Sequence, residues 1–328
     1  MRNPAFYGMM PVSISHEGYS AKPVHSYWDN FWALRGYKDA VMLAGALDKP
    51  DEVARFSTAR DEFSGDLTAS LAAAVRQHQL DFLPGSAELG DFDATSTTIA
   101  LAPGGEQQRL PPELLNNTFE RYWKEFTDRR DSKREWKEYT PYEWRNVAAF
   151  VRLGWRDRAW DATAFFFKDR APQPWNQWAE VVSRTPRTPF FVGDLPHAWV
   201  ASDFVRSVLD MFAYGREADA SLVIAAGTPT RWFDGKGIGI AELRTPYGRL
   251  NYTLQRTDKQ LVLQLQPGLI LPPGGVVFAW PYQGEPGKAS INGEPAQWEN
   301  GELRIQQLPA SVQIDVPSAV RRAERAAQ

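Results

Sequence analysis

An aromatic, helix-forming stretch near the start of the chain decides the fold. Residues 26–47 read SYWDNFWALRGYKDAVMLAGAL, and their large apolar side chains fall on almost every face of a helix. A helix that is apolar all round is typical of a buried position, so we expect it to pack inside a helical domain. Pro50-Asp51-Glu52 begins a second helix that runs to about His78, because proline and acidic residues suit the first helical turn. The short link between the two predicts a helical hairpin.

The helical pattern continues toward the middle of the chain. Further helices are expected at residues 111–130, 141–153, 156–168, 175–182 and 197–214. Leu83 to Gly105 is rich in glycine, aspartate, serine and threonine, which favours a long loop with one short helix. About seven helices, paired in sequence, follow from this pattern.

After Gly215 the apolar side chains change to the alternation that is typical of strands. The alternating residues are Leu261, Leu263 and Leu265, and later Val312, Ile314 and Val316. Asn292-Gly293 and Asn300-Gly301 favour tight hairpin turns. We therefore expect an α plus β, multidomain chain. Its parts are a helical region at 1–217, an antiparallel β-sandwich at 218–318 and a charged tail at 319–328.

The composition excludes several classes of function. The 328 residues are 43% hydrophobic and 23% charged, which is typical of a globular protein, and no apolar run is long enough to cross a bilayer. A net charge of −3 gives no general reason to expect nucleic-acid binding, which relies on clustered lysine and arginine. The chain has no cysteine, and its four scattered histidines lack metal-ligand spacing. We expect no metal, no cofactor, and no nucleic-acid or membrane partner.

Aromatic residues point to a class of substrate. The chain has 13 Trp, 11 Tyr and 18 Phe, and most of the Trp precede Gly215. Flat aromatic faces stack on the C–H faces of sugars, although many Trp are simply large core residues. A carbohydrate is therefore the favoured substrate, and core packing is the alternative for each ring.

Glycoside hydrolysis requires two carboxyl groups, one protonated to help the leaving group depart and one ionised to activate water or attack directly. Asp29 is the first candidate, because it lies among four aromatic rings in the stretch SYWDNFW at 26–32. Partial desolvation by these rings would favour the protonated acid, which suits a proton donor. The alternative is an acid that only interacts with the dipole at the start of its helix.

Glu180 is the second candidate. It is the only acid between Ala171 and Phe191, and it lies in the aromatic and apolar stretch PWNQWAEVV at 174–182. Arginines are close by in the sequence. The alternative for Glu180 is therefore a buried salt bridge to Arg184 or Arg187.

Other residues are candidates for sugar binding, because polar loops can hold sugar hydroxyl groups and rings beside the candidate acids can stack on a sugar. The expected substrate-binding residues are Trp28, Trp32, His16, Glu17, Tyr19, Asp91, Asp93, Trp175, Trp178 and His197. Turn formation and helix capping are the alternatives for Asp91 and Asp93, because Asp before a helix commonly caps it.

Three segments resemble the six-hairpin, (α/α)6-barrel glycosidases, the superfamily of glucoamylase-like, trehalase-like and rhamnosidase-like enzymes. Tyr27-Trp28-Asp29-Asn30 is similar to the segment that carries the general acid of glucoamylase-like enzymes, although these have Glu as the acid and a second Glu where this chain has Asn30. The stretches WAE at 178–180 and DLPHAWVAS at 194–202 are similar to the segment with their general base. The stretch TPYGRL at 245–250, with the later strands, resembles the small β-sandwich that closes many bacterial members.

The resemblance implies a partial (α/α)6 toroid of helical hairpins followed by the sandwich. It also implies an inverting hydrolase of an oligo- or polysaccharide, with Asp29 as general acid and Glu180 as general base. A full barrel needs six hairpins, more than are readable here, so we expect the first hairpins to belong to a longer parent enzyme. Those hairpins would be a partner of this chain. The sequence leaves the compartment open, and a secreted or periplasmic parent is the expectation.

Two other functions stay open. In a non-catalytic carbohydrate-binding or scaffold protein, the aromatic rings would bind glycan and the acids would be structural. A polysaccharide lyase on a similar helical toroid would abstract a proton beside a uronate, commonly with Tyr or His. Tyr19, His16 and His25 are the residues that keep the lyase alternative open.

Overall fold

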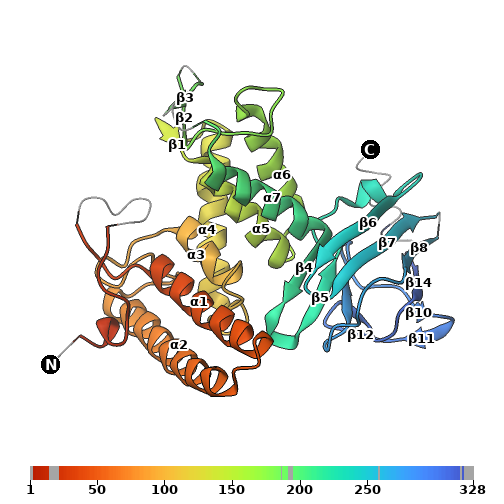
Figure 1. The fold of residues 1–328 in the computed structure, drawn as a ribbon. Helices are drawn as coiled ribbons and strands as arrows, with labels where there is room; N and C mark the ends of the chain where they lie inside the picture. Colours follow the sequence, from red (N-terminus) through yellow and green to blue (C-terminus); the bar gives the residue numbers. More distant parts are fainter. Residues whose placement is uncertain are drawn as a thin grey trace. The chain divides into compact units, whose positions relative to one another are not determined.

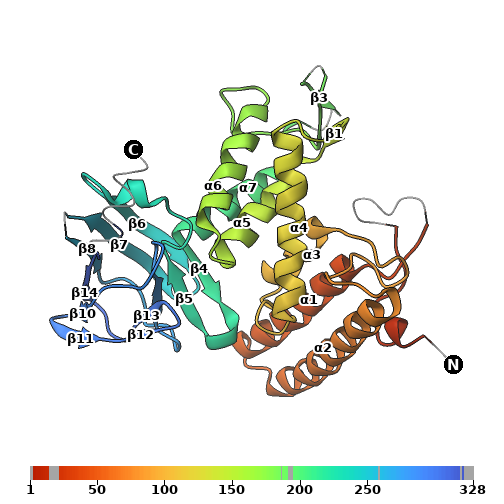
Figure 2. The same ribbon diagram turned by 180° about the vertical axis from the view of Figure 1, so that it is seen from behind.

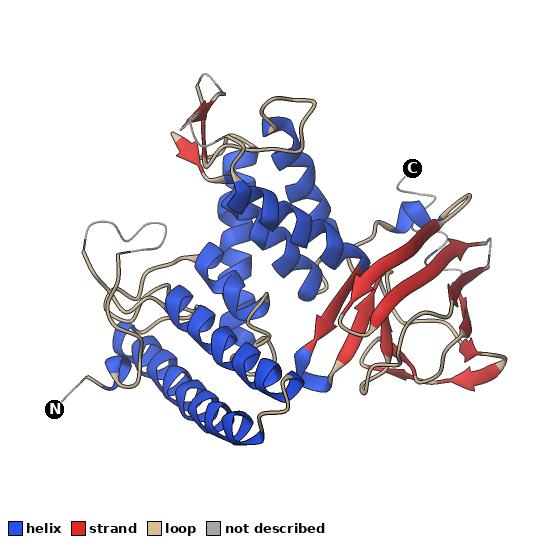
Figure 3. Cartoon of the chain, viewed as in Figure 1, coloured by secondary structure: helices blue, strands red, loops and turns tan. Residues whose placement is uncertain are grey.

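The computed structural model describes residues 3–14, 22–185, 187–190, 195–257, 259–317 and 320. The chain divides into two compact units (Figure 1). Unit 1 comprises Met1–Ala149 and Val181–Phe190, and unit 2 comprises Phe150–Glu180 and Phe191–Gln328. Helix α5 (Trp144–Arg152) contains the first point of division. A helical region followed by a β-sandwich is the fold class that the sequence predicts, and the distribution of helices and strands confirms it (Figure 3).

Helices α1 (Tyr27–Ala46) and α2 (Pro50–His78) form the predicted hairpin of unit 1 and lie side by side in both views (Figures 1 and 2). The buried face of α1 carries Tyr27, Phe31 and Leu34, spaced about one helical turn apart. Met42 and Leu43 on the same helix are 59% and 55% exposed. Burial on all sides, which the sequence predicts for α1, is therefore wrong for the structure described.

The rest of unit 1 follows the predicted order of loop and helix. The loop after α2 contains one short helix, α3 (Ala94–Leu101), in which every residue except Thr95 is buried. Helix α4 (Pro112–Arg130) begins with proline in its first turn, and a 3-10 turn at Pro141–Glu143 leads into α5. These elements confirm the predictions for residues 83–105, 111–130 and 141–153.

The helix predicted at residues 175–182 is wrong. Val181–Ser183 forms strand β2 instead, between β1 (Glu138–Tyr139) and β3 (Pro189–Phe190) in a three-stranded antiparallel sheet. The residues from 171 to 177 form a loop, in which the Ala171 amide donates to the Gln177 carbonyl oxygen at 2.9 Å. The β-branched side chains of Val181 and Val182 then favour a strand, in which Val182 pairs with Tyr139 of β1 and Val181 with Phe190 of β3.

Two helices belong to unit 2 together with the sandwich. They are α6 (Arg156–Phe166), which a 3-10 turn at Phe167–Asp169 extends, and α7 (Ala198–Phe212). The buried Arg156 guanidinium donates to the carbonyl oxygens of Ala225 at 3.1 Å and Ala226 at 2.9 Å, and so joins α6 to the strand region. Burial lowers the pKa of Arg156 to about 10, which still leaves it charged at neutral pH. The change from helix to strand falls after Phe212, whereas compact unit 2 begins at Phe150, and the boundary at 217 stays a prediction.

The sandwich consists of two sheets whose inner faces share one core (Figure 2). One sheet has the order β12-β13-β9-β5-β4, with bounds Trp298–Glu299, Glu302–Ile305, Val276–Ala279, Ser221–Ile224 and Ala213–Arg216. The other has the order β11-β10-β14-β8-β7-β6, with bounds Glu294–Ala296, Ala289–Ile291, Ala310–Asp315, Gln260–Leu265, Gly248–Arg256 and Ile238–Thr245. The pair β5·β9 is parallel, and the other described pairs in both sheets are antiparallel.

The structure confirms the strands and the tight turns that the sequence predicts in the sandwich. Alternate residues of β8 and β14 are buried, including Leu261, Leu263, Val312 and Ile314. Asn292 and Asn300 have φ of 51° and 52°, and the glycine after each also has positive φ, as a tight hairpin turn requires. Of the predicted tail at 319–328, only Val320 lies among the described residues. No described helix is both long and apolar enough to span a membrane.

The close approach of Gly274 to Asp219 generates a stability prediction. A Cβ atom at Gly274 would overlap the Asp219 carbonyl oxygen, which is backbone and cannot move aside easily. We expect Gly274→Ala to lower the free energy of unfolding by about 2 kcal/mol, because overpacking forces the backbone to shift. The measurement is urea denaturation of both proteins. Gly215→Ala, where a Cβ meets nothing within 4 Å, is the matched control and should change stability by less than about 0.5 kcal/mol. Equal stability of the two variants would contradict the packing argument.

Candidate functional site

The start of α1 is joined to two loops by backbone hydrogen bonds within unit 1. Ser13 and Val24 form an antiparallel bridge, and so do Ser26 and Ser86. The Tyr27 amide donates to the Gly85 carbonyl oxygen at 2.9 Å. Residues near 13, 26 and 86, which are far apart in the sequence, therefore meet where the side chain of Asp29 leaves the helix.

Asp29 lies in the first turn of α1 and is half-buried. The Ser13 hydroxyl donates a hydrogen bond to its carboxylate. A half-buried carboxylate with a hydroxyl partner can act as a proton donor or can bind a sugar hydroxyl group. Its position in the first helical turn also fits the alternative of a favourable interaction with the helix dipole.

Trp28 and Trp32 flank Asp29 on the same helix. Their ring centroids are 6.0 Å apart with an interplanar angle of 70°, an edge-to-face arrangement. Trp28 is half-buried, whereas Trp32 is 37% exposed. An exposed ring supported by a second ring, one helical turn from a carboxylate, is suited to contact the apolar face of a sugar.

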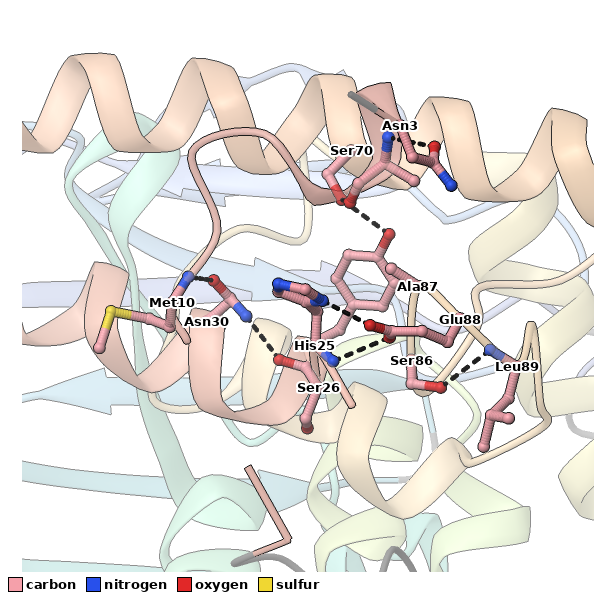
Figure 4. Close-up of polar contacts among 12 residues, drawn as sticks. Asn3, Met10, His25, Ser26, Asn30, Ser70, Ser86, Ala87, Glu88 and Leu89 are labelled. Atoms are coloured by element: carbon pink, nitrogen blue, oxygen red, sulfur yellow. Dashed lines mark hydrogen bonds and ion pairs between the residues drawn. The ribbon is translucent and has the colours of Figure 1, made fainter. Parts of the chain in front are cut away.

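His25 and Glu88 form a pair beside this helix start that the sequence did not single out. Oε1 of Glu88 lies 2.5 Å from Nδ1 of His25, and Oε2 accepts from the His25 backbone amide at 2.8 Å (Figure 4). The imidazole also stacks on Phe6, with ring centroids 4.8 Å apart. Glu88 was missed because its contact with His25 spans 63 residues. The polar, glycine-rich composition of the loop at 83–105 was the sequence signal that could have indicated Glu88 as a site residue.

The orientation of the pair defines the chemistry that His25 can perform. A carboxylate at Nδ1 favours the tautomer with the proton on that nitrogen, so Nε2 carries a lone pair. Nε2 has no hydrogen-bond partner in the part of the chain that the structure describes. His25 is 17% exposed at its side chain. It can therefore accept a proton or a hydrogen bond from a small molecule.

Buried hydrogen bonds hold the helix start in place. The Asn30 side chain accepts from the Met10 amide at 2.9 Å and donates to the Ser26 carbonyl oxygen at 2.6 Å (Figure 4). The Tyr27 hydroxyl lies 2.9 Å from the Ser70 hydroxyl, which donates to the Ala5 carbonyl oxygen. Burial raises the pKa of Tyr27 against the opposing effect of Ser70, so the phenol stays neutral. These contacts link the N-terminal segment, α1 and α2.

Asp91 and Asp93 take the roles that the sequence left as alternatives. Asp91 accepts from the amide of Ser86 at 3.1 Å and from its hydroxyl at 2.8 Å, and so closes a turn. Asp93 is the N-cap of α3, where it accepts from the Ser96 amide at 2.9 Å. His16, Glu17 and Tyr19 lie outside the described residues.

The candidate residues of unit 2 differ in their surroundings. Glu180 is half-buried, and its Oε2 lies 3.9 Å from Nε2 of His197, the residue that precedes α7. Trp175 is 57% exposed. Trp178 is fully buried, and its Nε1 donates to the Phe166 carbonyl oxygen at 2.8 Å. Core packing, the alternative for every Trp, therefore applies to Trp178, and no ring face is left for a sugar.

Glu143 is an acid in an aromatic setting that the sequence analysis did not select. It is buried in unit 1, where Arg129 donates to Oε1 at 2.8 Å and Tyr122 donates to Oε2 at 2.5 Å. Burial and the neighbouring carboxylate raise the pKa of Tyr122, so it remains a donor. An enclosed ion pair of this kind is structural, because both partners are buried and pair with each other. Elsewhere among the described residues, no group of three or more His, Cys, Asp or Glu could hold a metal ion.

Comparison with solved structures gives distant likenesses. No protein-family model matches the chain, and no curated protein matches it. A solved structure described as alpha-L-rhamnosidase from Dictyoglumus thermophilum matches with a TM-score of 0.43 and 10% sequence identity. The match covers 87% of this chain and 32% of that one, so the chain spans about a third of the rhamnosidase's length.

The capping role of Asp93 can be tested. Asp93→Ala removes the acceptor for the Ser96 amide, and we expect it to lower the free energy of unfolding by about 1 kcal/mol. Asp93→Asn keeps an N-cap acceptor and should cost only a few tenths of a kcal/mol, roughly. Thermal and urea unfolding measure both variants. If Asp93→Ala instead weakened sugar binding and left stability unchanged, the carboxylate would be a ligand contact and not a cap.

Proposed function

We propose that the chain is part of a glycoside hydrolase that acts on an oligo- or polysaccharide. The arrangement at the start of α1 carries this proposal. A half-buried carboxylate, Asp29, lies in the same part of the helix as the contacting rings of Trp28 and Trp32, and the Trp32 ring is exposed. Aromatic rings that hold a sugar beside a carboxyl group are what cleavage of a glycosidic bond requires.

In this proposal Asp29 is the general acid. Its carboxyl group gives a proton to the leaving-group oxygen as the bond from that oxygen to the anomeric carbon breaks. The Ser13 hydroxyl donates to the carboxylate and restricts its orientation. The expected inverting reaction needs a second carboxylate to remove a proton from the attacking water, whose oxygen forms the new bond to the anomeric carbon.

Glu180 is the proposed general base. Its half-buried carboxylate, with Oε2 3.9 Å from Nε2 of His197, can accept a proton from the attacking water. Trp175, five residues earlier, offers an exposed ring for a sugar. Glu180 belongs to unit 2 and Asp29 to unit 1, so each role rests on the surroundings within its own unit.

The His25–Glu88 pair favours a second candidate function, that of a polysaccharide lyase. A histidine whose Nδ1 is held by a carboxylate can remove a proton from the carbon beside a uronate carboxylate through Nε2. The leaving sugar oxygen would then depart as a carbon–carbon double bond forms. The product would be unsaturated and would absorb in the near ultraviolet, unlike a hydrolysis product.

Two substitutions test the hydrolase. Asp29→Asn and Glu180→Gln should each lower kcat/KM on oligosaccharides by at least about a hundredfold, because each removes an acid–base group. Sugar affinity should change far less, since the amides keep the shape and hydrogen-bonding capacity of the acids. Activity is measured by release of reducing sugar across a panel of oligosaccharides, and proton NMR identifies the anomer formed first.

The control is Asp39→Asn, which removes an acid farther along α1 that pairs with Arg35. It should leave turnover unchanged. Sugar binding without turnover in the wild-type chain and in its longer parent would support a carbohydrate-binding protein instead. An unsaturated product lost in His25→Ala, but kept in Asp29→Asn, would establish the lyase.

A further inference from the structure

Unit 1 contains a cavity whose residues take no part in the proposed site. It has a volume of about 250 Å³ and lies between α1, α2 and the segment that leads into α4. Its wall is formed chiefly by large apolar side chains, among them Phe31, Leu34, Leu67, Leu71, Leu83 and Leu110. Each of these six is less than a tenth exposed. An enclosed space with such a wall favours a hydrocarbon group over water.

Charged residues also line this cavity, and they are mainly cationic. Arg76 is exposed, and its guanidinium has no hydrogen bond or ion pair within the described part of the chain. Arg109 is 62% exposed at its side chain, makes a long contact of 3.4 Å with Glu106 and interacts electrostatically with Asp61. An anion that reached the opening would find two exposed guanidinium groups.

The one lining acid does not cancel these charges. Glu106 is buried, and its carboxylate forms an ion pair with the buried ammonium group of Lys38. Lys38 also donates to the Gly104 carbonyl oxygen at 2.7 Å. Asp61, whose pKa the neighbouring Arg60 lowers, is paired with that arginine at 2.8 Å. The unbalanced charge at the opening is therefore positive.

We propose that this cavity binds an amphipathic carboxylate, with its hydrocarbon tail between α1 and α2 and its carboxylate on Arg76 and Arg109. A cavity of roughly 150 Å³ accommodates benzene, so a volume of about 250 Å³ suits a tail of about eight carbons. The apolar wall supplies affinity for the tail, and planar guanidinium groups match a carboxylate head. The cavity shares no residue with the proposed carbohydrate site, so the two proposals are tested independently.

Calorimetric titration with sodium octanoate tests the proposal. We expect one octanoate per chain with a dissociation constant of about 0.1–1 mM, as suits a ligand of this size. 1-Octanol has the same tail and no charge, and octyltrimethylammonium has the opposite charge. Octanol should bind at least about fivefold more weakly, and the cation should not bind measurably.

Variants separate the head from the tail. The double variant Arg76→Gln, Arg109→Gln should weaken octanoate at least about fivefold and leave octanol within about twofold. Arg55→Gln, an exposed arginine of α2 outside the cavity, is its control. Ala72→Phe, at an exposed position that lines the cavity, should weaken both ligands by obstruction. Ala69→Phe, exposed on the same helix but not lining the cavity, should weaken neither.

Three results would overturn the proposal. If octanoate did not bind, or bound no better than octanol, the guanidinium groups would have no role in binding. Octanoate binding that the double variant leaves unchanged would do the same. Binding that Ala72→Phe leaves unchanged would place the ligand elsewhere on the chain. The exposed positions of Arg76 and Ala72 make these variants compatible with folding, and circular dichroism checks this.

Discussion

The backbone pairing between residues 24–27 and 84–87 is the constraint on which the candidate site of unit 1 depends. The Tyr27 amide and the His25 carbonyl oxygen are both used in this pairing, with Gly85 and Ala87 as partners. It fixes where α1 begins, and hence where the first-turn residue Asp29 points. It also places Glu88 against the His25 ring. A loop that would otherwise be free to move becomes a rigid support for one end of a helix.

The role of an acid in this chain depends on the groups that contact its carboxylate and not on its neighbours in the sequence. Asp29 and Glu143 both lie among aromatic residues in the sequence, but Glu143 is enclosed with Arg129 and Tyr122. Removing one member of such a buried pair leaves an uncompensated charge, which is costly. Asp29 has a neutral hydroxyl partner and partial exposure. A change of protonation at Asp29 therefore disturbs the fold less, which is a property that an acid–base residue needs.

The two arrangements of charge and apolar surface in unit 1 suit different ligands. The helix start presents polar groups next to an exposed ring, as a sugar with hydroxyl edges and C–H faces requires. The cavity between α1 and α2 separates its apolar wall from cationic groups, as a ligand with a tail and a charged head requires. Since α1 contributes to both, one aromatic helix serves two chemically distinct surfaces.

The sequence by itself determined the local structure of this protein. Periodicity and proline position located α1 and α2, and alternation with Asn-Gly turns located β8, β14 and two hairpins. Those signals act between near neighbours, so no tertiary context was needed. Only the tertiary structure decided that Trp178 lies in the core, that α6 joins unit 2 through Arg156, and that Glu88 holds His25. Each of these contacts joins residues that lie well apart in the sequence, and such a pairing is not encoded in a local pattern.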